Sequence, residues 1–521
     1  MGIIIAILAA YIVVAIIIGI YFHKKSGTIS DFVLGGREVG PWITAFAYGT
    51  SYFSAVVFIG YAGRFGWTYG VSATWIGLGN AFIGSLMAWI ILGRRTRVMT
   101  KHLESATMPE FFERRYLSKV IKVAAALVVF IFLIPYTASV YNGLSRLFEM
   151  TFQIPYEACV VGMAFVTAFY VITGGYKATA YNDFIQGIIM LIGIILVIGT
   201  ALSNQGGLFS SLMKLSEIKT ESGSMAGMAG GFTSFFGPDP INLVGVIILT
   251  SLGTWGLPQM VHKFYTIKDE RSIKAGTVVS TVFALIIAGG CYFLGGFGRI
   301  FTDNALPEKG FDDIIPTMMN TLPDILLGIV VVLVLSASMS TLSSLVLTSS
   351  STLTLDLIKP MVKNKLDEKK SIMVMRVFIG VFLFISVLIA FKKTALISDL
   401  MGYSWGALAG AFLAPFMYGL FWKKTTRASV YVSFIFAVSV TVLHLIFKPT
   451  WVIGGFSLAS PINVGALIMV SSLVIVPLVS LATPKLDKVK VNGIFSCYEQ
   501  KVAVSHVESL TQNEPQITME D

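Results

Sequence analysis

Residues 325–352 read ILLGIVVVLVLSASMSTLSSLVLTSSST, an unbroken apolar run that continues into a segment crowded with Ser and Thr. The apolar part is typical of a membrane helix, because about 20 apolar residues rising ~1.5 Å each cross a hydrocarbon core of ~30 Å. The hydroxyl-rich part has two interpretations. Ser and Thr line helix contacts and bond the carbonyl four residues earlier, or their oxygens together hold a cation.

The rest of the chain has the same apolar character. Of 521 residues, 55% are hydrophobic and only 13% are charged, too few to cover a soluble domain of this length. The composition therefore predicts an all-α polytopic membrane protein, since lipid leaves no water to satisfy exposed backbone groups. We expect about thirteen transmembrane helices, at roughly 2–21, 41–62, 71–92, 120–140, 156–174, 181–203, 240–262, 274–298, 323–355, 373–391, 398–421, 428–447 and 461–481.

The positive charges predict the orientation. In the N-terminal stretch the charge follows the apolar core, so we expect a retained first helix and not a signal peptide. With the N-terminus outside, about 29 of the 38 Lys and Arg fall on the inner side, including those of HKFYTIKDERSIK at 262–274. Such asymmetry is the positive-inside pattern. It predicts a protein of the plasma (inner) membrane with a cytoplasmic C-terminus, and it explains the net charge of +10 without nucleic acid.

Enzyme signatures are weak. The three cysteines, Cys159, Cys291 and Cys497, lie far apart, and the five histidines form no metal-ligand pair. GYSWG at 402–406 matches the nucleophile pattern G-x-S-x-G, but it begins a membrane span instead of following a strand. We therefore predict that the protein is not an enzyme.

Two spans contain helix-weakening residues at matching places, five spans apart. Span 2 has Gly-Thr-Ser at 49–51, and span 7 has Gly253, Gly256 and Pro258. Interrupted spans in corresponding halves are typical of inverted-repeat transporters with a site at mid-membrane, although Gly is common in membrane helices anyway. The expected segments are a first helix and loop at 1–40, a first repeat at 41–203, a second repeat at 204–421, peripheral helices at 422–481 and a cytoplasmic tail at 482–521.

The hydroxyl-rich segment presents its oxygens on one helical face. Ala337, Ser340, Thr341 and Ser344 follow the spacing of that face, and Ser343 lies three residues beyond Ser340. A hard cation such as sodium takes oxygen ligands, including backbone carbonyls. For a single Ser the packing interpretation is the commoner one. The cluster, taken with the interrupted span 2, favours an ion site.

Two charged residues are further candidates. Asp183 lies near the predicted start of span 6. An ionisable group in or near the membrane costs free energy, which makes Asp183 a candidate functional residue. It could bind a cation or the hydroxyl cluster, or it could simply cap the helix beside Lys177. Arg37, just before span 2, could latch an inner gate or be an ordinary cytoplasmic charge.

Three stretches resemble the sodium:solute symporter family, which includes bacterial proline, pantothenate and monocarboxylate symporters. They are DFVLGGREVGPWITAFAYGTSYFSAVVFIGYAG at 31–63, TGGYKATAYNDFIQG at 173–187 and ASMSTLSSLVLTSSSTLTLDLIK at 337–359. The resemblance extends from span 1 through span 13. It implies a LeuT-like inverted repeat of 5+5 helices and symport driven by Na⁺ through alternating access.

The resemblance also implies where the sodium binds. The principal site would use the carbonyls of Thr50, Phe53 and Ala337 with the hydroxyls of Ser340 and Thr341. Arg37 matches a family arginine linked to coupling. Some members have a second sodium site, and its residues match Asp183, Ser340, Ser343 and Ser344.

The solute is less clearly indicated. Proline carriers have an aspartate where this chain has Tyr52, and a Trp and a Tyr where it has Thr250 and Thr254. The span 2 stretch looks more like that of monocarboxylate-type members. The resemblance therefore implies a short monocarboxylate or an amino acid such as proline. The candidate pocket residues, from the two broken helices, are Tyr52, Ser54, Thr254 and Trp255, of which Trp255 could equally be a packing residue.

Two other functions remain open from the sequence. A transporter-fold solute sensor would need an output domain, and a passive channel would show flux without accumulation. The expected partners are a small-molecule solute, sodium ions and the lipid bilayer, with no nucleic acid and no obligatory protein partner.

Overall fold

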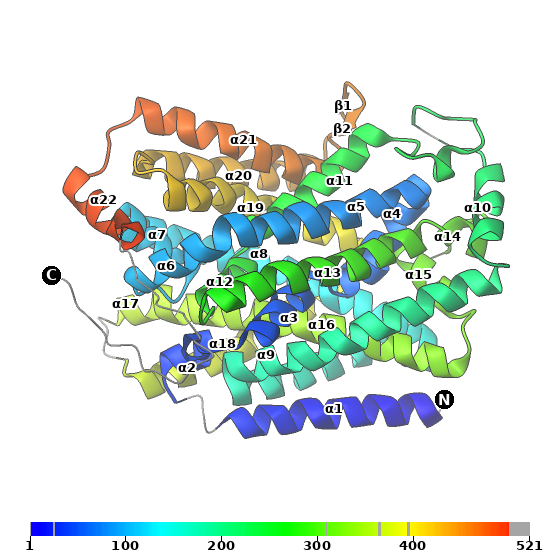
Figure 1. Ribbon diagram of the computed structural model, residues 1–521, viewed down its shortest axis with the longest axis horizontal. Coiled ribbons are helices and arrows are strands. Elements are labelled where there is room, and N and C mark those ends of the chain that lie inside the picture. Colours follow the sequence, from blue (N-terminus) through cyan, green and yellow to red (C-terminus); the bar gives the residue numbers. More distant parts are fainter. Residues whose placement is uncertain are drawn as a thin grey trace, which may run out of the picture.

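The computed structural model is a bundle of long helices (Figure 1). It describes residues 2–23, 27–221, 223–308, 310–362, 366–392 and 396–499. Within these ranges, ten helices are long and apolar enough to cross a membrane. The predicted class, an all-α multi-pass membrane protein, is confirmed, whereas the count of about thirteen spans stays a prediction.

The first half of the chain runs as far as the longest helix. In the labels, η marks a 3₁₀- or π-helical turn. The elements are α1 (Gly2–His23), α2 (Ile29–Leu34), η1 (Gly35–Arg37), α3 (Pro41–Tyr52), η2 (Val56–Tyr61), α4 (Ala62–Tyr69), η3 (Gly70–Ala73), α5 (Thr74–Gly79), η4 (Asn80–Met87), η5 (Trp89–Gly93), α6 (Arg94–His102), α7 (Met108–Tyr116), α8 (Lys119–Phe152) and α9 (Tyr156–Asn204).

The second half adds two short strands. Its elements are α10 (Leu208–Glu217), η6 (Gly231–Thr233), α11 (Pro240–Leu252), η7 (Gly253–Trp255), α12 (Pro258–Tyr265), α13 (Glu270–Gly295), α14 (Gly298–Phe301), η8 (Phe311–Asp313), α15 (Ile314–Met319), α16 (Asp324–Thr352), η9 (Leu353–Ile358), α17 (Lys359–Met361), α18 (Glu368–Phe391), α19 (Ile397–Phe421), α20 (Arg427–Phe447), β1 (Val452–Ile453), β2 (Phe456–Ser457), α21 (Pro461–Ala482), α22 (Lys488–Phe495) and η10 (Ser496–Tyr498).

Local sequence accounts for many helix starts. The side chains of Ser118, Thr426 and Ser460 each accept a hydrogen bond from a backbone N–H of the first turn of α8, α20 and α21. Proline is tolerated at the first helical position because the N–H it lacks would have no helical partner there. It takes up this place in α3, α11, α12 and α21.

Glycines with positive φ divide the two longest helical stretches. Val56–His102 has 47 residues and Tyr156–Asn204 has 49, which at ~1.5 Å per residue is about twice what a ~30 Å core requires. Gly70 has φ 64° and ψ −144°, and Gly175 inside α9 has φ 57° and ψ −155°. The chain turns at both residues, so each stretch consists of two helical segments.

Span 2 is interrupted, although not where the sequence suggested. Helix α3 ends at Tyr52, and Phe53 is extended with φ −111° and ψ 119° before the helical turns resume in η2. The predicted Gly-Thr-Ser segment remains helical. Gly49 serves packing instead, because a Cβ there would lie 2.7 Å from the Phe283 ring.

The second interruption lies between α11 and α12. The chain passes through η7 and Leu257, which is extended, and Pro258 begins α12. The sequence placed HKFYTIKDERSIK in an inner loop, but His262 and Lys263 belong to α12 and are buried. A short helix that follows a break can still direct polar side chains into the protein.

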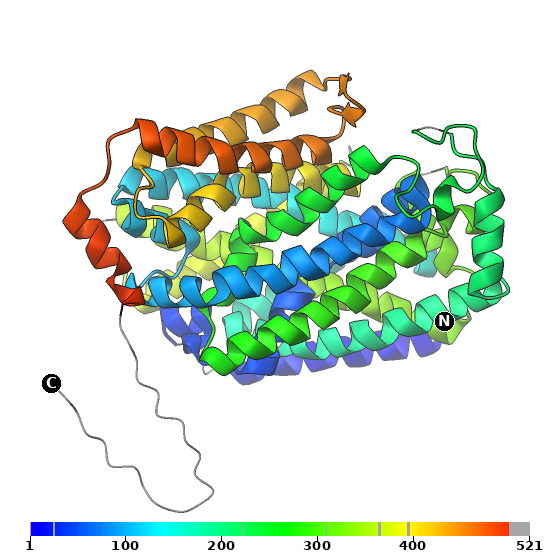
Figure 2. The same ribbon diagram turned by 45° about the horizontal axis from the view of Figure 1, so that its top comes forward.

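Helix α16 lies at the centre of the bundle and packs on α1, α3, α8, α9 and α12. From Gly328 to Thr352 almost every side chain of α16 is buried. Figures 1 and 2 both place α1 along one side of the bundle and α20 with α21 along the opposite side. Because neighbouring helices surround α16, its Ser and Thr residues face protein and not lipid.

The two ends of the bundle differ. Helices α6, α7 and α22 lie at one end, whereas α10, α14, α15 and the β1–β2 hairpin lie at the other (Figure 1). Residues 204–239, between predicted spans 6 and 7, and residues 299–322, between predicted spans 8 and 9, contain short helices. Of the predicted tail, residues 488–498 form α22 and η10, and residues 500–521 lie outside the described ranges. Orientation and the repeat boundaries remain predictions.

Candidate functional site

The broken end of α3 meets the hydroxyl face of α16. The Ser340 Oγ lies 3.0 Å from the Thr50 carbonyl oxygen and 3.0 Å from that of Ala337. The Thr341 Oγ1 lies 3.4 Å from the Ser51 carbonyl oxygen and 3.1 Å from that of Ala337. All five residues are buried. The structure thus brings together four of the five residues predicted for the principal sodium site, and adds Ser51.

Five oxygens therefore converge without any formal charge. The Thr50 and Ser51 carbonyls lose their helical partners because α3 stops at Tyr52. Carbonyl oxygens only accept, and a hydroxyl can rotate its proton away and offer a lone pair. Such a set of neutral oxygens suits a hard monovalent cation.

Phe53, the fifth predicted ligand, stays a prediction. No hydrogen bond from α16 to its carbonyl occurs in the described part of the chain, and its ring stacks on Tyr52 with centroids 4.4 Å apart. Ser51 contributes a further carbonyl that the sequence did not predict. The interruption of span 2 could have indicated Ser51, since any helix end frees the carbonyls of its last residues.

Ser343 and Ser344 continue the hydroxyl face. The Ser344 Oγ is 2.8 Å from the Ser51 Oγ, and the Ser343 hydroxyl donates to the Ser340 carbonyl at 2.9 Å. Asp183, the fourth residue of the predicted second site, forms an ion pair with Lys263 of α12. Its Oδ2 lies 3.5 Å from the Lys263 Nζ.

The helix-cap interpretation of Asp183 is wrong. Asp183 lies inside α9, which runs without a new start from its kink at Gly175. Lys263 itself was missed, because it was counted with the loop charges. Its signal was its position only five residues after Pro258, within an interrupted span.

A small cavity adjoins this ion pair. Its volume is about 10 Å³, enough for about one water molecule. Its lining is mainly polar and comes from α9, α12 and α16: Tyr176, Thr179, Gln259, His262, Lys263, Ser344, Leu347 and Thr348. The cavity connects Lys263 with the hydroxyl face of α16.

The predicted solute residues fall into two groups. Tyr52 donates from its hydroxyl to the Thr250 carbonyl at 2.5 Å and stacks on Trp405 with centroids 6.4 Å apart. The Ser54 Oγ accepts the Val56 N–H at 3.2 Å at the break itself. These two residues lie where the broken spans 2 and 7 meet α19.

Thr254 and Trp255 face the π-helical turn η4. The Thr254 hydroxyl donates to the Gly84 carbonyl at 3.0 Å, and the Trp255 Nε1 donates to the Ile83 carbonyl at 3.0 Å. Tyr48 also donates to the Gly84 carbonyl, at 2.8 Å. A π-helical turn frees carbonyls for such contacts. The Gly84 carbonyl is therefore a shared hydrogen-bond acceptor for both interrupted spans, which the sequence did not reveal.

Arg37 connects three segments at the end of the bundle where α6 and α7 lie. Its guanidinium donates to the Tyr265 carbonyl at 2.8 Å and to the Ser105 carbonyl at 2.9 Å. Burial and the positive charge of Arg97 lower the pKa of Arg37 to about 10, so it keeps its charge at neutral pH. Arg37 thus ties η1 to α12 and to the loop after α6.

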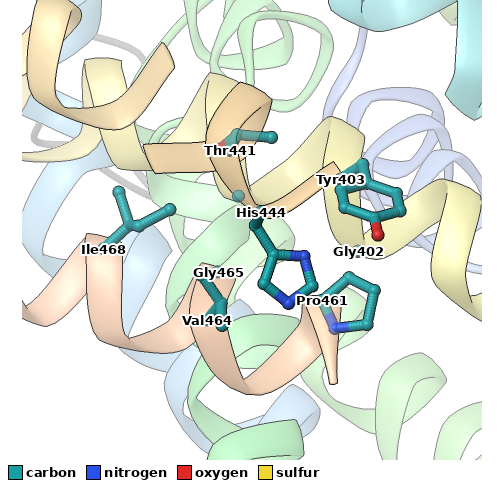
Figure 3. Close-up of a pocket in the computed structure, with 9 residues that line it drawn as sticks. Gly402, Tyr403, Thr441, His444, Pro461, Val464, Gly465 and Ile468 are labelled. Atoms are coloured by element: carbon teal, nitrogen blue, oxygen red, sulfur yellow. The ribbon is translucent and has the colours of Figure 1, made fainter. Parts of the chain in front are cut away.

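A further cavity, too narrow to hold a water molecule, lies between α19, α20 and α21 (Figure 3). In this view the His444 ring lies beside Pro461, with Tyr403 above it to the right, and a ring nitrogen lies 2.9 Å from the Leu458 carbonyl oxygen. None of the residues lining this cavity belongs to the cation or solute groups described above. Glycines and apolar side chains make up most of its wall.

The chain is similar to known transporters. The model of the sodium:solute symporter family matches residues 32–436. The chain is 29% identical to the osmoregulated proline transporter OpuE of Bacillus subtilis over 80% of this chain and 83% of that one. It is 30% identical to a sodium/proline symporter of Staphylococcus aureus over 81% of both chains.

Among solved structures, the fold is similar to that of a Na⁺-coupled sialic acid symporter in a substrate-bound outward-open state. The TM-score is 0.74 at 16% identity, over 93% of this chain and 98% of that one. At this identity the likeness concerns the fold alone.

Proposed function

Because the chain belongs to the sodium:solute symporter family, we propose that it imports a small organic solute with sodium by alternating access. The solute is a short monocarboxylate or an amino acid such as proline. The protein is a multi-pass membrane transporter, and sodium is its coupling ion. The family and the relatives named above are transporters and not enzymes.

The contact between α3 and α16 carries the proposal. Sodium would bind among the Thr50, Ser51 and Ala337 carbonyls and the Ser340 and Thr341 hydroxyls. Bound there, it would brace the broken end of α3 against α16. The same broken end positions Tyr52 and Ser54, so sodium binding would order part of the solute pocket.

Contacts at both ends of the bundle support alternating access. At one end Arg37 ties η1 to α12. At the other, the Arg64 Nη1 of α4 contacts Asp399 Oδ1 at 2.5 Å and Ser398 Oγ at 2.7 Å, both on α19. We assign the Arg37 contact to the cytoplasmic gate and the Arg64 contact to the outer gate, with the N-terminus outside and the C-terminus cytoplasmic.

The finer architecture belongs to the same proposal. Dividing the two long stretches at Gly70 and Gly175 raises the number of crossings above the ten candidate helices, towards the thirteen expected. The interrupted helices α3–α4 and α11–α12 would be the first helices of two inverted five-helix repeats, at 41–203 and 204–421. Spans 12 and 13 would be peripheral.

The solute assignment rests on a shared chemical group. Monocarboxylates and proline both present a carboxylate, and the half-helices after each break direct their positive N-terminal ends towards the centre of the bundle. The relatives named above are proline transporters. Tyr52, where proline carriers have an aspartate, provides no partner for an amine and favours a monocarboxylate.

The sodium ligands give the first prediction. Ser340→Ala and Thr341→Ala should each raise the sodium concentration for half-maximal uptake at least about tenfold, which corresponds to 1.4 kcal/mol of lost binding. The measurement is solute uptake into proteoliposomes over a series of sodium concentrations. Ser338→Ala is the matched control, because its hydroxyl bonds the Val334 carbonyl of its own helix. Unchanged sodium dependence in both test variants would remove the assigned site.

The solute can be identified with the same preparation. Radiolabelled L-proline, acetate, lactate and pyruvate would be offered with and without an inward sodium gradient. We expect accumulation of one class only when the gradient is present. Flux that does not saturate and never accumulates would indicate a channel, and sodium-dependent binding without flux would indicate a sensor.

A further inference from the structure

A buried ion pair connects α12 with α9 beside the hydroxyl face of α16. The Lys263 Nζ lies 3.5 Å from the Asp183 Oδ2, and the two side chains are 2% and 0% exposed. The Lys263 ammonium also lies 5.1 Å from the centre of the Tyr176 ring. Buried charges are costly unless they are paired, so these two residues hold each other in place.

The charges at this position are already balanced. The predicted second sodium site would consist of the neutral Ser340, Ser343 and Ser344 hydroxyls and the single negative charge of Asp183. Lys263 adds one positive charge, and it lines the same cavity as Ser344. A sodium ion placed here would therefore leave one uncompensated positive charge in a buried site.

The principal site differs in this respect. Its five oxygens belong to neutral groups, and in the described part of the chain no charged side chain hydrogen-bonds to any of them. A cation at that site would therefore not compete with a positively charged side chain hydrogen-bonded to these oxygens. The two neighbouring oxygen groups are thus electrostatically distinct, although both draw on Ser340.

We propose that the Lys263 ammonium takes the place of a second sodium ion at Asp183, so that the protein binds and carries one sodium ion per solute. The inference rests on the proposed sodium symport. It assigns Lys263 as the residue that sets the ion stoichiometry, and it makes Asp183 a partner of that lysine instead of a sodium ligand.

Equilibrium binding of ²²Na⁺ to the purified protein tests the inference without any knowledge of the solute. Wild type should bind one sodium ion per protein. Lys263→Met should bind two, because Asp183 and the serine hydroxyls then lack a cation. Lys263→Arg, which keeps the positive charge, and the double variant Asp183→Asn/Lys263→Met, which removes both charges, should each bind one.

The matched control is Lys122→Met. Lys122 is also a largely buried lysine, its Nζ lies 3.6 Å from the Asp356 Oδ1, and it lies on α8, away from the hydroxyl face. This variant should still bind one sodium ion. Thermal unfolding of every variant establishes that the purified protein is folded.

The outcomes separate the inference from the proposed function. Two sodium ions bound to wild type, or one bound to folded Lys263→Met, would overturn the role of Lys263 and leave symport intact. No sodium bound to wild type would contradict the proposed function itself. If Lys263→Met does not fold, the wild-type stoichiometry and Lys263→Gln decide the question.

Discussion

At the scale of single residues, Gly84 shows how closely the solute region is packed. A Cβ at this position would lie 2.4 Å from the Tyr52 hydroxyl oxygen. The Gly84 carbonyl meanwhile accepts hydrogen bonds from Tyr48 and Thr254. One glycine therefore fixes the distance between span 3 and both interrupted helices.

Gly84→Ala should displace the Tyr52 ring and weaken solute binding. We expect the KM for solute to rise roughly tenfold, equivalent to 1.4 kcal/mol, because Tyr52 is held by the Thr250 carbonyl and cannot move freely. Gly93→Ala is the control, since its nearest neighbour would be at an ordinary 3.5 Å. An unchanged KM in Gly84→Ala would exclude Tyr52 from the solute pocket.

Asp312 is a second residue with a measurable consequence. It lies in η8, outside the candidate membrane spans, and its Oδ2 accepts the Ile397 N–H at 3.2 Å. Burial raises the pKa of Asp312 from 3.8 to about 6, although that N–H and the charges of Arg146 and Arg64 oppose the shift. The neighbouring charge of Asp399 acts in the same direction as burial.

The sign of the pH effect follows from this raised pKa. Between pH 3.8 and about 6 the folded protein binds more protons at Asp312 than the unfolded chain, so stability falls as pH rises through this window and levels off above it. Asp312→Asn should remove this fall and stabilise the protein at neutral pH by up to about 3 kcal/mol. Thermal unfolding from pH 4 to pH 7 measures the effect, with exposed Asp303→Asn as control. A parallel pH profile in wild type and Asp312→Asn would refute it.

At the scale of secondary structure, the candidate functional groups of this protein lie where its helices are irregular. The break at Phe53 frees two carbonyls, the π-helical turn η4 presents two more, and the break before Pro258 begins the short helix that carries Lys263. Regular helices have satisfied their own backbone groups and offer only side chains. Ion and solute chemistry therefore gathers where the helices are interrupted.

Gly175 is the irregularity that shapes α9. Its φ of 57° with ψ of −155° lies in a region open essentially to glycine, and a Cβ would lie 2.8 Å from the Phe32 carbonyl oxygen. Gly175→Ala should destabilise the fold by about 1–3 kcal/mol or more, measured as a lower unfolding temperature. Gly162→Ala in the same helix meets nothing within 4 Å and should be neutral. Equal unfolding temperatures would show that the kink is not required.

At the scale of the whole molecule, charged contacts hold both ends of the bundle. Arg37 bridges η1, α12 and the loop after α6, and Arg64 bridges α4 and α19. A transporter that alternates must open these contacts in turn. Weakening one of them should therefore shift the population towards the conformation open on that side.

The Arg37 contact can be tested with a reporter cysteine. In a cysteine-free background, Thr348→Cys places a thiol in the cavity beside Lys263. Arg37→Gln should increase the rate of its modification by a cytoplasmic, membrane-impermeant maleimide several-fold, because the inner end opens more often. Arg64→Gln should leave that rate unchanged or lower it. Faster modification in both variants would indicate general loosening instead of gating.

Much of this molecule could be predicted from the sequence because lipid imposes strong rules. Apolar length, the absence of water and the distribution of Lys and Arg predict a helical membrane protein. The spacing of Ser340, Thr341 and Ser344 depends only on helical geometry. The family resemblance was confirmed by the match over residues 32–436.

The remaining features depend on contacts between residues distant in the sequence. Ser51 joins the oxygen group because the exact end of α3 decides which carbonyls face α16. Trp255 faces η4 because η7 turns it there. Lys263 looks like a loop charge until α12 folds it onto Asp183, 80 positions earlier.

The sequence by itself determined the membrane environment, the helices and the hydroxyl face of α16, since all three follow from composition and local periodicity. Only the tertiary structure decided which oxygens meet and which charges are neutralised. A hydrogen bond or an ion pair acts over a few ångströms, and the backbone breaks that set those distances are positioned by packing across the whole bundle.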